Sequence, residues 1–103
     1  MLSHNVFFSL HDNSPAAVDR LVDACKTYLN DHPGTCFFAA GKLAGEYQRP
    51  VNDRAFDVAL SVVFTDGGSH DAYQQAPRHL KFITENQANW KQVRVFDAWV
   101  DAR

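Results

Sequence analysis

The residues best suited to chemistry in this sequence flank a proline, in the segment from Tyr73 to His79 that reads YQQAPRH. A neutral imidazole can accept a proton from carbon beside a carbonyl, and a tyrosine hydroxyl can hydrogen-bond the developing enolate oxygen. In an uninterrupted helix, six steps of about 100° would leave Tyr73 and His79 about 120° apart around the axis. Pro77 cannot donate the helical hydrogen bond and pushes Ala76 away from helical geometry. The sequence therefore predicts a broken helix whose break allows the two side chains to face one cavity.

The strands that must support this broken helix are predicted from alternating residues. His4, Val6 and Phe8 lie on one face of the first strand, and Asn5 and Phe7 lie on the other. Because this strand carries phenylalanine on both faces, we expect both faces of the sheet to be covered. Strands are predicted over residues 4–10, 35–43, 56–64 and 92–100.

Two helical regions separate these strands. Ser14 followed by Pro15 predicts a helix start, because a hydroxyl caps free amides and a proline ring suits the first helical position. Apolar residues at three- and four-residue steps predict an amphipathic helix over 15–30, and the broken helix is expected over 69–89. The order β-α-β-β-α-β indicates the α+β class and a single ferredoxin-like domain over residues 1–103, with a four-stranded antiparallel sheet and helices on one face.

The sheet face without helices is expected to carry apolar side chains, namely Phe7, Ala59, Val63 and Phe96. Such a face is predicted to pack against the same face of a second copy, which gives a homodimer in the form of a dimeric α/β barrel and protects the strand edges. The alternative is that these residues are scattered and tolerated on a monomer.

The other face places polar residues among apolar ones. His4 shares a face with Val6, and Asp97 shares a face with Val95. If both faces point to the helices, His4 and Asp97 enter the same mostly apolar cavity as Tyr73. The predicted site therefore has two catalytic candidates, Tyr73 and His79, and six ligand-binding candidates, His4, Val6, Phe8, Leu60, Trp90 and Asp97.

In this order and spacing, the residues resemble the stress-responsive A/B barrel family, also called the dimeric α/β barrel (Dabb) family. The resemblance covers almost the whole chain and implies ferredoxin-like homodimers whose sheets join into a barrel, with a link to stress responses. The family motif is usually His-Pro-x-His, and Ala76 replaces the first histidine here. The motifs that carry the resemblance are His4-x-Val6-x-Phe8-x-Leu10, Phe56-Asp57-x-Ala59-Leu60, Pro77-x-His79-x-x-Phe82 and Val93-x-Val95-Phe96-Asp97.

The resemblance to one family member, a plant polyketide cyclase, implies a reaction that the site could catalyse. That enzyme closes a linear polyketide by aldol condensation without a cofactor, and Tyr73 and His79 match its acid–base pair. His4 and Asp97 match polar residues of its pocket, whereas a further strand histidine is Val58 here. A cofactor-independent acid–base enzyme acting on a small apolar carbonyl or aromatic compound is thus one hypothesis.

Three other hypotheses remain open. The pocket could bind a small molecule without chemistry. The same four polar residues could be structural, with His4 and Asp97 simply paired across neighbouring strands. The protein could also act in stress through self-association into oligomers larger than two.

Composition and charge disfavour several function classes. With a net charge of −2, a pI of about 6.2 and no basic run, we expect no nucleic-acid partner. No apolar run approaches the ~20 residues that cross a bilayer, and the N-terminus does not read as a signal peptide, so we expect a cytoplasmic protein without a membrane partner.

Cys25 and Cys36 are expected as buried, reduced thiols. His11, His32 and His70 lack metal-ligand spacing and are expected at surface or turn positions, so neither a metal nor a cofactor is predicted.

Overall fold

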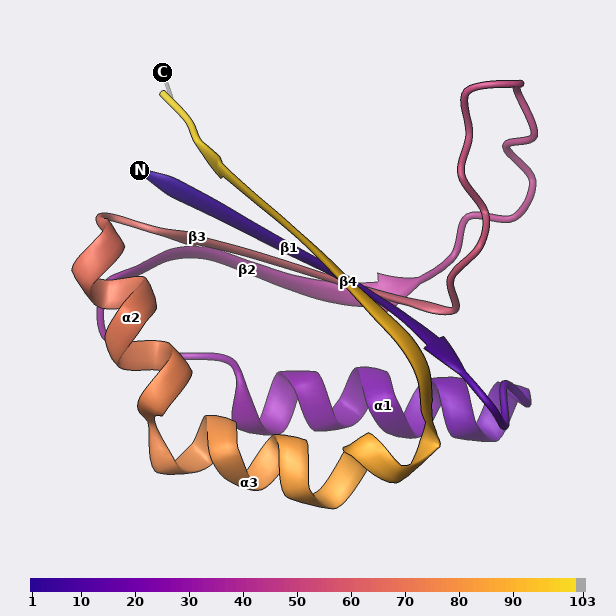
Figure 1. The fold of residues 1–103 in the computed structure, drawn as a ribbon, viewed down its shortest axis with the longest axis horizontal. Helices are drawn as coiled ribbons and strands as arrows, with labels where there is room; N and C mark the ends of the chain where they lie inside the picture. The colour runs from indigo at the N-terminus through magenta and orange to yellow at the C-terminus, as the bar shows by residue number, and fades with distance from the viewer. Residues whose placement is uncertain (102–103) are drawn as a thin grey trace.

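The computed structural model describes residues 1–101 as a sheet with helices packed against one of its faces (Figure 1). The predicted β-α-β-β-α-β order is confirmed, with the second helical region divided in two. The elements are β1 (Leu2–Leu10), α1 (Pro15–Tyr28), β2 (Thr35–Lys42), β3 (Val58–Phe64), α2 (Gly67–Gln75), α3 (Pro77–Asn86), a short 3-10 helix η1 (Gln87–Asn89) and β4 (Trp90–Trp99). Predicted boundaries differ from these by two or three residues at several ends.

The four strands form one antiparallel sheet in the order β2-β3-β1-β4. The first strand is central and pairs with both β3 and β4. Its His4 lies opposite Val62 of β3 on one side and Asp97 of β4 on the other. The register therefore places a histidine and a carboxylate side by side on the sheet, at the edge strand.

The helix boundaries follow from local capping. The Ser14 hydroxyl accepts a hydrogen bond from the Ala17 amide at 3.3 Å, and Pro15 occupies the first turn of α1. Asp66 caps α2 in the same way, with its carboxylate 2.7 Å from the Ser69 amide. Ala76 is extended (φ −63°, ψ 139°) and separates α2 from α3, as the proline after it requires.

The hydrophobic core lies between the helices and the facing side of the sheet. Alternate residues of β1 and β3 are buried there, and α1 adds one apolar stripe. Figure 1 shows α1 and α3 beneath the sheet and α2 standing steeply at one end, where it directly follows β3. The core includes Val6, Phe8, Leu10, Val18, Leu21, Cys25, Leu29, Val58, Leu60, Val62, Phe64, Tyr73 and Phe82.

The opposite face of the sheet carries the predicted aromatic residues. Phe7 packs edge-on against Phe96 and Phe56, with ring centroids 5.7 and 4.9 Å apart. More than half of the surface of Phe96 is exposed, and so is that of Phe37, which the sequence analysis did not assign to this face. We call Phe7, Phe37, Val63 and Phe96 the helix-free face below.

One cysteine prediction is wrong. Cys25 is buried in the core as expected, but Cys36 is exposed. The reason is that Cys36 falls where the pairing of β2 with β3 shifts register, on a strand at the edge of the sheet. Both thiols are free among the described residues. No helix within residues 1–101 is long and apolar enough to cross a bilayer.

Candidate functional site

The break at Pro77 brings the rings of Tyr73 and His79 together. Tyr73 lies near the end of α2 and His79 in the first turn of α3. Their ring centroids are 4.6 Å apart in an edge-to-face arrangement, and both residues are more than nine-tenths buried. The two side chains therefore point inward, toward the sheet, rather than into solvent.

A cavity lies between these two helices, β1 and β4. It encloses about 140 Å³, and about 470 Å³ when the space at its open side is included. Val93 and Val95 of the edge strand β4 line it and remain partly exposed, because no helix covers that edge. Asp97 is the one predicted site residue that does not line this cavity. The seven that line it are His4, Val6, Phe8, Leu60, Tyr73, His79 and Trp90.

Asp97 is linked to the cavity by a hydrogen bond to His4, which lines it. The Nδ1 atom of His4 lies 2.6 Å from a carboxylate oxygen of Asp97. His4 is buried, whereas 42% of the Asp97 side chain is exposed. Burial lowers the pKa of His4 although the hydrogen bond to Asp97 acts in the opposite direction, so the imidazole is neutral and donates Nδ1–H to the carboxylate. This pairing fixes the orientation of the His4 ring.

Several polar atoms at the cavity are buried without a hydrogen-bond partner among residues 1–101. They are the Tyr73 hydroxyl, Nδ1 of His79 and Nε1 of Trp90. An unsatisfied buried polar atom costs about 1–3 kcal/mol, which makes such atoms rare in folded proteins. Three such atoms belong to residues that line one cavity, so hydrogen-bonding capacity that the described residues leave unused is concentrated there.

Burial also sets the protonation of the two central groups. It raises the pKa of Tyr73, so the phenol stays protonated and can donate. Burial lowers the pKa of His79 to about 4, and the nearby His32, His4 and His70 act in the same direction. At neutral pH the pair is therefore a tyrosine O–H donor beside a neutral but weakly basic imidazole.

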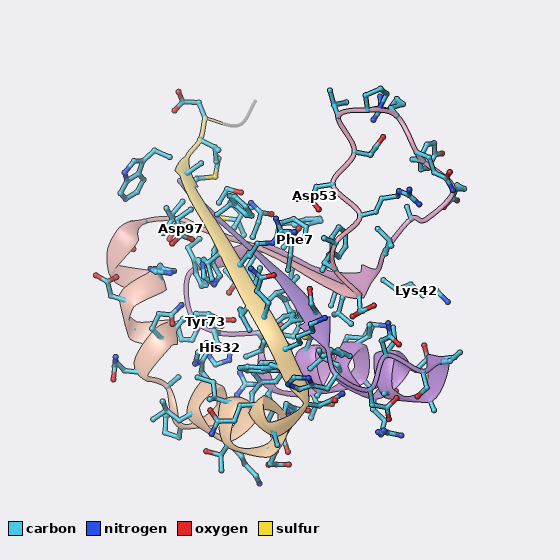
Figure 2. All side chains as sticks on the ribbon, turned by 45° about the vertical axis from the view of Figure 1, so that its right-hand side comes forward. Phe7, His32, Lys42, Asp53, Tyr73 and Asp97 are labelled. Atoms are coloured by element: carbon cyan, nitrogen blue, oxygen red, sulfur yellow. The ribbon has the colours of Figure 1, made fainter. Side chains whose placement is uncertain are left out.

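Two of the three remaining histidines pack around the site. His32 lies in a turn as expected but is buried, and His70 lies partly buried on α2, so the surface-or-turn prediction is wrong for His70; His11 is exposed as expected. His32 is buried, with its ring 4.9 Å from that of Tyr73 and its Nε2 2.7 Å from the Tyr28 carbonyl oxygen. Figure 2 shows Tyr73 and His32 on the same side of the sheet, beneath Asp97 on β4. The ring of His70 is 4.9 Å from that of His4.

His70 and His32 reach the site for different reasons. His70 precedes Tyr73 by three residues on α2, so helical spacing alone could have placed it on the same face. His32 lies in the turn after α1, and Gly34 in that turn has φ +82°. A Cβ atom on Gly34 would overlap the Ser69 side chain, so glycine lets the turn approach the start of α2. No pattern in the sequence predicts that approach.

A family model matches nearly the whole chain. Residues 2–100 match the family model described as Stress responsive A/B Barrel Domain. The chain belongs to the stress-responsive A/B barrel domain family. This confirms the resemblance drawn from the sequence motifs. A search of curated proteins gave no match.

Solved structures share the fold over nearly the full chain. A protein of Arabidopsis thaliana has a TM-score of 0.80 at 18% identity and covers 100% of this chain and 98% of its own. A dimeric ferredoxin-like protein of unknown function from Thermobifida fusca has a TM-score of 0.79 at 18% identity, covering 96% and 90%. A hydroxynitrile lyase from Passiflora edulis has a TM-score of 0.76 at 18% identity, covering 99% and 94%. At these identities the likeness shows the ferredoxin-like fold.

Proposed function

We propose that this A/B barrel domain protein is a homodimer that binds a small apolar carbonyl or aromatic compound in the cavity between sheet and helices. The observation that carries the proposal is the set of buried polar atoms without partners, above all the Tyr73 hydroxyl and Nδ1 of His79. Both belong to residues that line the cavity. A ligand that accepts from Tyr73 and hydrogen-bonds His79 removes two unfavourable contributions at once.

The lining defines the chemistry of this ligand. Val6, Phe8 and Leu60 offer an apolar wall suited to an aromatic or aliphatic body. Tyr73 and Trp90 supply an O–H and an N–H, which suit the acceptor oxygen of a carbonyl. The enclosed volume of about 140 Å³ is smaller than the range of about 300–1,000 Å³ typical of ligand sites, so a single ring that extends into the open side of the cavity fits best.

Thermal shift with a panel of small aromatic aldehydes, ketones and phenols tests the binding proposal. At least one compound should raise the melting temperature of the wild-type protein, and Tyr73→Phe should reduce that shift. Tyr28→Phe is the matched control, because the Tyr28 hydroxyl is exposed and bonds Glu85 outside the cavity. Equal shifts in the wild type and in Tyr73→Phe for every compound would contradict the proposed site.

Acid–base catalysis is the second candidate, and the contact between Tyr73 and His79 favours it. In this reaction His79 accepts a proton from carbon beside a carbonyl, and the C–H electron pair forms an enolate whose oxygen Tyr73 hydrogen-bonds. The enolate carbon then attacks a second carbonyl of the same molecule, a C–C bond forms, and His79 returns the proton to the new alkoxide. The hydroxynitrile lyase from Passiflora edulis supports this candidate only by showing that an enzyme can have this fold.

Catalysis ranks second because a pKa of about 4 makes His79 a weak base. Deuterium exchange at carbon beside the carbonyl of a bound compound, followed by NMR in D₂O, measures the first step. His79→Gln should abolish any protein-dependent exchange, and Tyr73→Phe should slow it by roughly 10²–10⁴-fold. Binding without exchange in the wild type would leave the protein as a binding protein.

The homodimer is proposed to form through the helix-free face. Support comes from the exposure of Phe37 and Phe96 and from the description of the Thermobifida fusca protein as dimeric. Light scattering after size exclusion should give twice the mass of the 11.6 kDa chain. A monomer at micromolar concentration would contradict the dimer, and larger oligomers would favour the self-association hypothesis. Localisation in the cytoplasm stays a prediction.

A further inference from the structure

Two of the histidines and one carboxylate meet beside the cavity, where only His4 lines it. His4, His70 and Asp97 come from β1, α2 and β4, so three separate elements converge there. One ligand atom from each residue lies within 4.8 Å of the other two. No sequence spacing announces this cluster, because the three residues are spread over the whole chain.

From this convergence we propose that His4, His70 and Asp97 form a binding site for a first-row divalent metal ion, with Zn²⁺ as the best match. Two imidazoles and one carboxylate are a ligand set that Zn²⁺ uses at sites which keep a coordination position open. Calcium and magnesium are poorer matches, because they prefer oxygen ligands. The site needs neither Tyr73 nor His79, so it stands independently of the proposed ligand binding.

The distances are close to what an ion requires. Zn²⁺ binds nitrogen and carboxylate oxygen at about 2.0–2.2 Å, which puts two ligand atoms of a tetrahedral ion about 3.3–3.5 Å apart. Nδ1 of His4 and Oδ1 of Asp97 are 2.6 Å apart and must separate slightly. Since all three ligand atoms lie within 4.8 Å of one another, the most distant pair must close by at most about 1.5 Å, which a rotation of a side chain achieves. Asp97 is partly exposed and gives the ion a path from solvent.

The surroundings of the cluster support ligation. An ion between His4 and Asp97 takes the place of the proton that Nδ1 donates, and that proton moves to Nε2 of the same ring. Nδ1 of His70 lies 3.3 Å from a carboxylate oxygen of Asp71, and its Nε2 lies 3.3 Å from the side-chain nitrogen of Gln74. A proton held on Nδ1 by Asp71 leaves the Nε2 lone pair for the ion, which then replaces the contact with Gln74.

An ion here changes the cavity as well. His4 lines the cavity and its ring centroid is 6.0 Å from that of Tyr73. Three protein ligands leave at least one coordination position for water or for an oxygen of a bound compound. The ion is therefore expected to strengthen binding of compounds that carry a carboxylate or hydroxyl oxygen, over those with a lone aldehyde.

Isothermal titration of the untagged full chain with Zn²⁺ tests the proposal, with Co²⁺ and its visible absorption as a second probe. We expect one ion per chain, and a loss of more than about 10-fold in affinity for both His70→Ala and Asp97→Asn. His11→Ala is the matched control, because it removes an exposed histidine outside the cluster and should leave the affinity unchanged.

Two further results separate this proposal from the proposed function. His79→Gln should keep the Zn²⁺ affinity of the wild type while losing hydrogen bonding to an organic ligand. His70→Ala should keep the fold, which circular dichroism checks, because its side chain is not part of the core cluster. A wild-type protein without micromolar Zn²⁺ binding would overturn the site, and so would equal affinities of His70→Ala and His11→Ala.

Discussion

The two faces of the sheet differ in what they leave unsatisfied. On the helix-covered face, apolar side chains are buried, and the polar atoms of Tyr73 and His79 have no partner among the described residues. On the helix-free face the polar groups satisfy one another, since Ser61 donates to Asn5 and Asn5 donates to Ser3. There it is the apolar side chains, such as Phe96, that remain exposed. One face thus leaves hydrogen-bonding atoms without partners, and the other leaves apolar side chains exposed.

The largest expected effect comes from truncating neighbouring phenylalanines that point to opposite faces. Phe8→Ala removes a buried ring from the core and should lower the free energy of unfolding by about 3–5 kcal/mol at every protein concentration. Phe7→Ala removes a ring from the helix-free face, so its effect should depend on protein concentration if a second copy covers that face. Denaturant unfolding at several protein concentrations measures both. A concentration-independent effect of Phe7→Ala would mean that no copy packs there.

A charge on the helix-free face should separate the copies. Phe96→Asp buries a carboxylate in an apolar interface and should weaken dimerisation by at least about 100-fold, or about 2.8 kcal/mol. Sedimentation at micromolar concentration should then show a species of 11.6 kDa. Val51→Asp is the matched control, because Val51 is 83% exposed in the loop between β2 and β3 and should leave the mass unchanged. Dimers of undiminished affinity in Phe96→Asp would place the interface elsewhere.

The contrast between the two faces was predictable from the sequence because strand parity is a local property. Alternation along β1 places His4 and Phe8 on one face and Phe7 on the other, and Pro77 breaks the helix whatever the surroundings. The register between strands depends on residues far apart in the sequence. The order of the helices and strands was nevertheless enough to predict that His4 and Asp97 lie on neighbouring strands.

The rest of the site depends on tertiary contacts that no local pattern carries. His32 is buried only because the turn containing Gly34 packs against the start of α2, and Cys36 is exposed only because the edge strand β2 shifts register. His70 lies close to Asp97 only because of how α2 is oriented relative to β4, which the sequence pattern does not show. Sequence reasoning thus gave the sheet and the broken helix, but it found only part of the histidine cluster.

Acid should act on the helix-covered face. The pKa of His79 is about 4 in the folded protein and 6.5 in its ordinary state. Between these values the unfolded chain binds more protons, so stability is complete above pH 6.5 and falls as the pH drops toward 4. The loss from this residue should be at most about 3 kcal/mol. Denaturant unfolding of His79→Gln from pH 7 to pH 4 should give a flatter profile than that of the wild type. An unchanged slope in His79→Gln would show that the imidazole of His79 protonates as easily in the folded state as in the unfolded chain.

The smallest expected effect has an unusual sign. Tyr73→Phe removes a buried hydroxyl without a partner and keeps the ring, so it should raise the free energy of unfolding of the ligand-free protein by about 1 kcal/mol. Tyr28→Phe should instead lower it slightly or leave it unchanged, because that hydroxyl bonds Glu85 at 3.0 Å on the surface. Denaturant unfolding of both variants beside the wild type measures the difference. A loss of stability in Tyr73→Phe would mean that the hydroxyl already has a partner in solution, and the reason to expect a ligand at the helix-covered face would disappear with it.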